Sequence, residues 1–89
     1  MNAAPEMHKG LPVAGYKDQS DLSVAMVNTN KCMEEEILRR LDTLAAPEWH
    51  VDRRWLAIGR TAIEQGFMAL NRAIFQPERV VLPGDPPAA

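Results

Sequence analysis

The apolar residues of this chain recur at helical spacing in two stretches, which are separated by a short break. In the first stretch, over about residues 20–44, apolar side chains return every three, four or seven positions, and Asn30 interrupts the stripe. Asp18 or Ser20 is suited to cap the start of such a helix. The pattern predicts one long helix with an apolar stripe made of Leu22, Met26, Met33, Ile37, Leu41 and Leu44.

Charged residues mark the outer side of this first helix. Glu35 and Arg39 are four positions apart, and so are Glu36 and Arg40. Opposite charges at this spacing stabilise a helix by about 0.2–0.5 kcal/mol per pair. We therefore interpret the charged run as a face in contact with solvent.

A break and a second helix follow. The residue before Pro47 is disfavoured in helical geometry, so the first helix ends there. The second helix runs over about residues 52–75, with Asp52 as a plausible N-cap and Pro77 as its stop. The chain is predicted to be all-α, an antiparallel two-helix hairpin with an extended or short-helical N-terminal lead-in.

The second helix carries two apolar stripes of different kinds. One is made of small residues and starts at Trp55, and the other is bulky and is broken by Arg60. The first helix can cover only one of them, so the other is predicted to be an interface in a homo-oligomer, with a two-fold dimer as its first step. The small stripe is Trp55, Gly59, Ala62, Gly66, Ala69 and Ala73, and the bulky stripe is Leu56, Ile63, Phe67, Leu70 and Ile74.

Proline-rich ends limit the ordered part of the 89-residue chain. We predict a flexible tail over residues 1–13, a helical hairpin that binds the ligand over residues 14–76, and a proline-rich tail over residues 77–89. A core of about 60 residues usually needs disulfides, a metal or further copies of the chain. Cys32 is the single cysteine, which excludes an internal disulfide, so self-association is the expected route.

Charge and composition exclude several classes of function. Ten Lys and Arg against twelve Asp and Glu give a net charge of −2, which disfavours binding of a nucleic-acid polymer. No apolar run reaches the roughly 20 residues that cross a bilayer. His8 and His50 fall in the N-terminal tail and the interhelical loop, without a catalytic set, phosphate loop or zinc spacing around them. We expect a protein that is not an enzyme and uses neither a cofactor nor a metal.

Polar residues on a third face of the second helix are candidates for binding an anion. This face carries a guanidinium, a hydroxyl, a carboxylate and an amide, groups that suit a phosphate and a base edge. They suit hydrogen bonds and salt bridges between subunits equally, and spacing leaves both interpretations open. The face consists of Arg54, Thr61, Glu64, Met68 and Asn71.

Two further candidates lie near the N-terminal side. Tyr16 follows the flexible Gly15, and its ring can stack on a base, an interaction worth about 1–3 kcal/mol. The ammonium group of Lys31 can neutralise a phosphate. Taken alone, Tyr16 can equally anchor the lead-in on the hairpin, and Lys31 can simply face solvent.

In combination, these motifs resemble a known family. The run GYKDQSDLSVAMVNTNK and the later run RRWLAIGRTAIEQGFMALNRAI are similar to phage anti-CBASS cyclic-nucleotide sponges, and more distantly to the helical hairpin of anti-Thoeris sponges. The likeness covers about residues 14–80. Its most specific parts are the lead-in Gly-Tyr-basic motif, Asn28 with Lys31, and the Arg-Trp-Leu segment that leads to Thr61.

The resemblance implies an assembly and a set of ligands. Sponges of this family look like helical protomers that form dimers and then a trimer of dimers, a homohexamer. They bind cyclic dinucleotides such as 3',3'-cGAMP between protomers, and some bind cyclic trinucleotides in separate sites. They do not cleave the signal, so the CBASS effector stays inactive in the cytoplasm of the infected bacterium.

Residue roles follow from the same resemblance. Tyr16 would stack on the base, and Lys31 would contact a phosphate, with Asn28 beside it in the motif. Lys17 stands where relatives often have arginine, which weakens bidentate recognition at that position. The remaining basic and hydroxyl positions, which are not assigned to one pocket, are Arg54, Arg60 and Thr61.

A competing hypothesis makes the chain a small oligomeric helical adaptor that binds a host or phage protein. The chain contains five methionines, and methionine side chains adapt their shape to partners.

Overall fold

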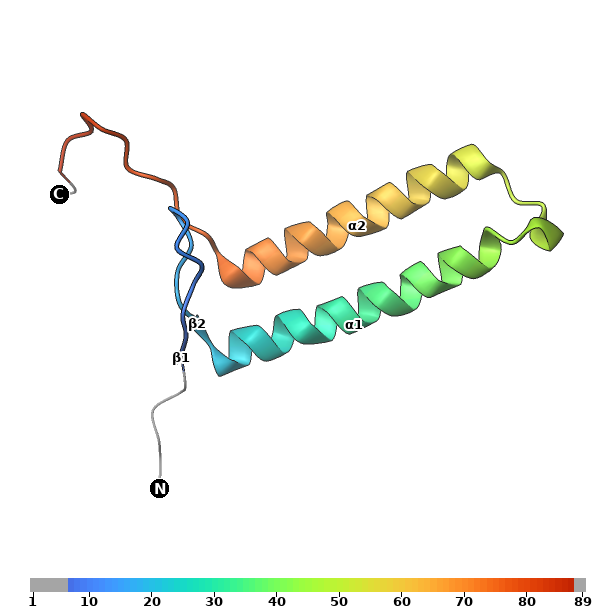
Figure 1. Ribbon diagram of the computed structural model, residues 1–89, viewed down its shortest axis with the longest axis horizontal. Helices are drawn as coiled ribbons and strands as arrows, with labels where there is room; N and C mark the ends of the chain where they lie inside the picture. The colour runs from blue at the N-terminus through green and yellow to red at the C-terminus, as the bar shows by residue number, and fades with distance from the viewer. Residues whose placement is uncertain (1–6, 88–89) are drawn as a thin grey trace, which may run out of the picture.

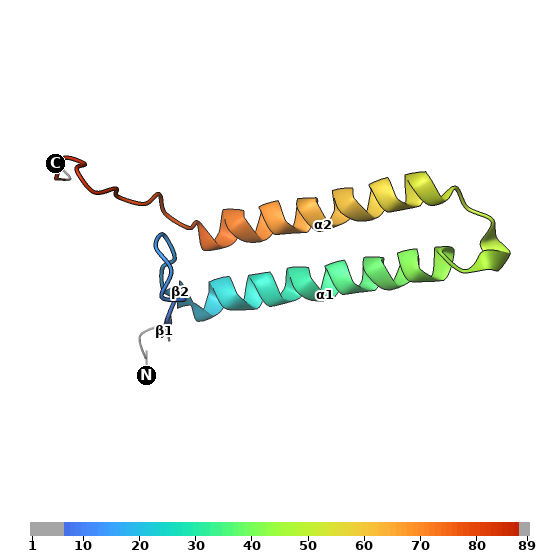
Figure 2. The same ribbon diagram turned by 45° about the horizontal axis from the view of Figure 1, so that its top comes forward.

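Two long antiparallel helices form a hairpin, as predicted. The computed structural model describes residues 7–87, with α1 over Asp21–Leu44, the short 3-10 helix η1 over Pro47–Trp49, and α2 over Arg53–Phe75. The two helices run side by side in both views, with η1 at the closed end of the hairpin (Figures 1 and 2). The helical hairpin predicted from the sequence is thus confirmed.

The helix ends follow local sequence rules. Ser20 caps α1, because its hydroxyl accepts a hydrogen bond from the backbone N–H of Ser23 at 3.1 Å. Asp18 does not cap the helix and instead accepts the backbone N–H of Gly10 at 2.9 Å. Asp52 caps α2, where its carboxylate accepts the N–H of Trp55 at 3.0 Å.

The C-terminal end of α2 turns the chain sharply. Gln76 adopts left-handed geometry, with φ 48° and ψ 58°, and its N–H donates to the carbonyl of Arg72 at 2.7 Å. Pro77 follows and lacks an N–H for another helical turn. This arrangement ends α2 at the predicted place and sends the following residues away from the helices, past the loop that carries Gly15 (Figure 1).

The N-terminal lead-in, which is the described chain before α1 (residues 7–20), contains a small sheet that the sequence did not predict. Strand β1, Met7–His8, pairs antiparallel with strand β2, Gln19–Ser20, so the chain is mostly helical rather than all-α. His8 Nε2 lies 2.5 Å from a carboxylate oxygen of Asp21, which joins the sheet to the first residue of α1. Such pairing joins residues far apart in sequence, so helical periodicity gives no sign of it.

The predicted domain limits fall as follows on the structure. The limit between residues 13 and 14 lies in the loop that connects β1 to β2. Residues 1–6 of the predicted N-terminal tail and residues 88–89 of the predicted C-terminal tail lie outside the described residues.

α1 covers the bulky stripe of α2. Leu56, Ile63, Phe67 and Ile74 are half-buried, whereas Leu70 is exposed. The small-residue stripe faces away from α1, and a Cβ atom added at Gly59 or Gly66 would meet no other atom within 4 Å. The partner for this stripe is therefore not α1 of the same chain.

On α1 the predicted apolar stripe is only partly correct. Leu22, Met26 and Met33 are exposed, although Ile37, Leu41 and Leu44 are half-buried as expected. Val27, which is 4% exposed, is the one buried side chain among the described residues. The buried face of α1 is therefore rotated relative to the predicted one. It includes Val27, and it excludes Leu22, Met26 and Met33.

A single chain remains open and elongated. Its radius of gyration is 18.9 Å, against about 12 Å for a compact chain of this length. Its accessible surface is 7579 Å², against about 5,200 Å² for a folded monomer of this mass. The chain therefore exposes far more surface than a compact protein of its size, and the homo-oligomer stays a prediction.

Candidate ligand-binding surfaces

The predicted ligand residues occupy separate places in one chain. Tyr16 and Lys17 lie in the lead-in before α1. Asn28 and Lys31 lie on the outer face of α1, and Arg54 and Thr61 lie on the outer face of α2. Arg60 lies on α2 beside α1.

Tyr16 sits in a tight turn with its ring half in solvent. Its N–H donates to the carbonyl of Val13 at 3.1 Å, and the side chain is 52% exposed. Gly15 before it has φ +89°, a conformation that side-chain-bearing residues rarely adopt. Lys17, which follows, is exposed. An aromatic face and an ammonium group therefore stand next to each other at the open end of the hairpin.

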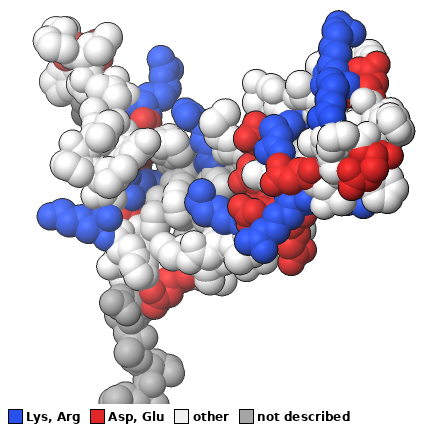
Figure 3. Space-filling model, turned by 45° about the vertical axis from the view of Figure 1, so that its right-hand side comes forward, with Lys and Arg blue, Asp and Glu red and all other residues white. Residues whose placement is uncertain are grey.

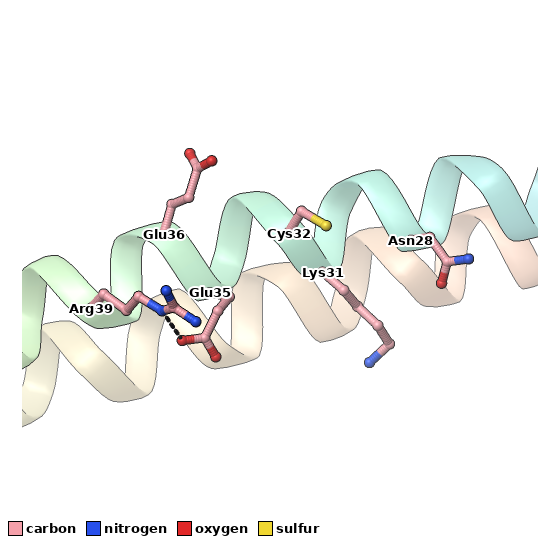
Figure 4. A pocket seen from close by; sticks show the side chains of 6 residues that line it. All are labelled: Asn28, Lys31, Cys32, Glu35, Glu36 and Arg39. Carbon is pink, nitrogen blue, oxygen red and sulfur yellow. Dashed lines mark hydrogen bonds and ion pairs between the residues drawn. The ribbon is translucent and has the colours of Figure 1, made fainter.

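Asn28 and Lys31 border a shallow hollow on the outer face of α1 (Figure 4). Its volume is about 440 Å³. Within residues 7–87 the ammonium of Lys31 makes no ion pair. A free cation beside an amide is a suitable contact for a phosphate.

Two acidic residues, one basic residue and a cysteine complete the hollow, namely Glu35, Glu36, Arg39 and Cys32. Arg39 Nε donates to Glu35 at 3.0 Å, which confirms one of the two predicted pairs. Glu36 and Arg40 make no ion pair in the described part of the chain, and Glu36 points away from the other lining residues in Figure 4. Arg39 thus pairs with Glu35, while Glu36 and Lys31 are both unpaired among the described residues, and the lining carries two positive and two negative side chains.

Arg60 lies beside α1, and its side chain is still 37% exposed. It forms an ion pair with Asp42 of α1, and it occupies the inward position between Leu56 and Ile63. The sequence did not predict this ion pair, because Asp42 and Arg60 are 18 positions apart on different helices and no helical spacing relates them. The pair satisfies part of the guanidinium, which has further N–H donors.

Arg54 and Thr61 are exposed on α2. The guanidinium carbon of Arg54 lies 5.5 Å from the ring centroid of Trp55, a cation–π contact. Thr61 borders a second shallow hollow, which it shares with Ala57, Ile58, Ala62 and Gln65. A hydroxyl among small apolar residues allows close approach of another molecule.

Asn71 departs from the polar face to which the sequence assigned it. Arg54, Thr61, Glu64 and Met68 are exposed, but Asn71 is half-buried and accepts a hydrogen bond from Asn30 at 3.1 Å. The same bond explains the amide that interrupts the apolar stripe of α1. Both residues join the helices of one chain.

The length of the hairpin separates the candidate residues. Tyr16 lies at the open end, where α1 begins and α2 ends, whereas Arg54 lies at the closed end (Figure 1). A helix of 23 residues spans about 35 Å at 1.5 Å per residue. A single chain cannot place Tyr16 and Arg54 on the same dinucleotide.

The charge distribution gives no broad basic surface on the face shown in Figure 3, where acidic and basic side chains alternate over the helices. Within residues 7–87 no group of three His, Cys, Asp or Glu side chains is placed to hold a metal ion. Neither α1 nor α2 is long and apolar enough to span a membrane.

Comparison with known proteins agrees with this architecture. The family model described as the Acb2/Tad1 hairpin domain matches residues 9–75. The chain belongs to this family. It is the family of the anti-CBASS and anti-Thoeris sponges, so its members have a general role as phage cyclic-nucleotide sponges. No curated protein and no solved structure matches the chain.

The matched region coincides with the hairpin and its lead-in. It begins directly after β1 and ends at Phe75, the last residue of α2. The chain beyond Phe75 therefore lies outside the sponge domain, although its backbone contacts the lead-in.

Proposed function

We propose that this sponge binds cyclic oligonucleotide second messengers and holds them without cleavage, so that CBASS effectors are not activated. Its ligands are cyclic dinucleotides such as 3',3'-cGAMP, and cyclic trinucleotides in a second type of site. The observation that carries the proposal is the family match over the whole hairpin. The place of action is the cytoplasm of the infected bacterium.

The dinucleotide pocket forms between copies of the chain in a homohexamer built as a trimer of dimers. The open shape of one protomer and the separation of its candidate residues support this arrangement. Nanomolar affinity requires about 12 kcal/mol of binding free energy. A ligand enclosed by two protomers meets two aromatic rings and several cations, whereas the shallow hollow of one chain offers far fewer contacts.

Each candidate residue has a distinct role in the proposal. The Tyr16 ring stacks on a base, and Lys31 with Asn28 contacts a phosphate, while Lys17 supplies a further positive charge. Arg54, Arg60 and Thr61 serve the second class of ligand. The exposure of the Tyr16 ring and the unpaired ammonium of Lys31 support the first set of roles.

The separation of the two histidines supports storage rather than turnover. His8 is paired with Asp21 beside the sheet, and His50 lies in the turn at the other end of the hairpin. A histidine acid and base pair for phosphodiester cleavage needs both rings within reach of the same phosphate.

Recovery of the ligand tests this proposal. The protein is incubated with 3',3'-cGAMP, the complex is isolated by gel filtration and denatured by heat, and the released nucleotide is identified by mass spectrometry. We expect the intact cyclic dinucleotide, in an amount that rises with the protein concentration. A linear product would contradict sequestration, and absence of nucleotide from the protein fraction would contradict binding.

A second candidate function is that of an oligomeric adaptor for a host or phage protein. Met26, Met33 and Met68 are exposed on the outer faces of the helices, which favours this function. Thermal unfolding separates the two. Ligand at 100 times its Kd adds about 2.7 kcal/mol to stability, so a sponge melts at higher temperature with its cyclic nucleotide. Absence of a shift with every cyclic di- and trinucleotide would favour the adaptor.

A further inference from the structure

The segment after α2 folds back onto the loop that carries Tyr16. Gln76 in left-handed geometry, followed by Pro77, directs the chain away from the helix axis. The segment then passes the loop between β1 and β2 at the open end of the hairpin (Figures 1 and 2). These residues follow the matched region, which ends at residue 75.

One tether joins this segment to the residue before Tyr16. The N–H of Glu78 donates to the carbonyl of Gly15 at 2.6 Å. A Cβ at Gly15 would overlap the carbonyl oxygen of Glu78, and Val80 Cγ2 would be 3.7 Å from it. The two backbones are therefore in direct contact, which requires a glycine at this position.

A second tether lies on the other side of Tyr16. The Gln19 side-chain amide donates to the carbonyl of Phe75 at 2.9 Å and lies 3.3 Å from the carbonyl of Lys17. Phe75 is the last residue of α2, where carbonyl groups lack a partner inside the helix. This amide thus connects the C-terminal end of α2 to the lead-in strand.

We propose that Gln19 and the backbone of Glu78 are positioning residues, which hold the Tyr16 loop in its ligand-binding conformation from both sides. This inference rests on the proposed function of Tyr16. The ring itself is about half exposed, and the one backbone bond of Tyr16 goes to Val13 within the same loop. The β1–β2 pairing and the Gly10–Asp18 bond hold the base of the loop next to α1, and the two tethers join its tip and its second strand to the end of α2.

The consequence is preorganisation of the pocket. A loop that is ordered before the ligand arrives loses less conformational entropy on binding, and affinity rises accordingly. Loss of one tether leaves the ring present but mobile. We expect it to raise the Kd for a cyclic dinucleotide by about tenfold, mainly through faster dissociation.

A matched pair of variants isolates the first tether. Glu78→Pro removes the N–H that donates to Gly15, whereas Glu78→Ala removes the side chain and keeps the N–H. Calorimetry with 3',3'-cGAMP should show about a tenfold weaker Kd for Glu78→Pro and an unchanged Kd for Glu78→Ala. Equal values for the two variants would overturn the inference.

Hydrogen exchange tests the tether without any ligand. In Glu78→Pro the amides of Tyr16 and Lys17 should exchange faster, while those in the middle of α1 and α2 keep their wild-type rates. Unchanged exchange in the loop would overturn the inference even in a protein that binds nucleotide. If Glu78→Pro shows faster loop exchange but the wild-type protein binds no cyclic nucleotide, the tether is supported and the proposed function is contradicted.

Gln19→Glu gives an independent test of the second tether. The substitution keeps the size of the side chain and replaces the donor amide with a carboxylate, which cannot donate to Phe75 at neutral pH. We expect the same faster loop exchange and the same weaker dinucleotide binding. Wild-type values for both measurements would remove Gln19 from the set of positioning residues.

Discussion

The side-chain amide of Asn30 donates to the side-chain oxygen of Asn71 at 3.1 Å, across the two helices and among half-buried residues. A half-buried polar pair between the helices favours one alignment, because a slip leaves both amides without a partner. It also explains why the apolar stripe of α1 is interrupted at this position.

This pair should show energetic coupling. Asn30→Ala and Asn71→Ala are each expected to lower the free energy of unfolding by about 1 kcal/mol, because one half-buried amide loses its partner. The double variant should cost less than the sum of the two single variants. Denaturant unfolding measures all three, and strictly additive effects would show that the two amides do not depend on each other.

Tyr16→Ala is expected to weaken dinucleotide binding by about 5- to 150-fold, because a stacked ring contributes about 1–3 kcal/mol. Tyr16→Phe keeps the ring and should bind nearly as well as the wild type. Calorimetry gives the affinities and native mass spectrometry gives the assembly. In the proposed role the ring contacts the ligand and not another subunit, so the oligomer should persist, and its dissociation in Tyr16→Ala would make Tyr16 a packing residue.

Arg60→Ala combined with Thr61→Val should reduce cyclic trinucleotide binding more than dinucleotide binding. The matched control is Asp42→Asn, which breaks the same ion pair and keeps the guanidinium. Asp42 is exposed, so its loss should cost less than about 1 kcal/mol of stability. If Asp42→Asn impairs trinucleotide binding as much as the double variant does, the contribution of Arg60 is to hold the two helices together.

Gly66→Leu tests the interface on the outer face of α2. Within one chain an added side chain at Gly66 meets open space, so the helix content by circular dichroism should stay the same. The larger side chain should prevent close approach of a second copy and lower the mass in light scattering. An unchanged mass would show that the small-residue stripe is not a subunit contact.

Gln76→Gly is expected to raise the free energy of unfolding by about 1 kcal/mol. Gln76 has φ 48°, and glycine adopts this left-handed geometry without the steric cost of a Cβ. Gln76→Ala retains the Cβ and should give no such gain. Thermal unfolding compares the three proteins, and equal stability of the glycine and alanine variants would show that residue 76 is not strained.

Local rules in the sequence were sufficient to predict where the two long helices begin and end. The 3.6-residue spacing, the caps at Ser20 and Asp52, and Pro77 each act within one or two turns, and the helices begin and end where these residues predict. The family resemblance carried by the lead-in and second-helix motifs is confirmed as well. The roles of the individual ligand residues remain predictions.

Contacts between residues that are distant along the chain could be determined only from the tertiary structure. Examples are the pairing of β1 with β2, the contact of Arg60 with Asp42, and the bond from Glu78 to Gly15. The same holds for the outward turn of Leu22, Met26 and Met33, because the face that a helix buries depends on where its neighbour packs. Periodicity defines which side chains share a face, but only the packed chain determines which face is covered.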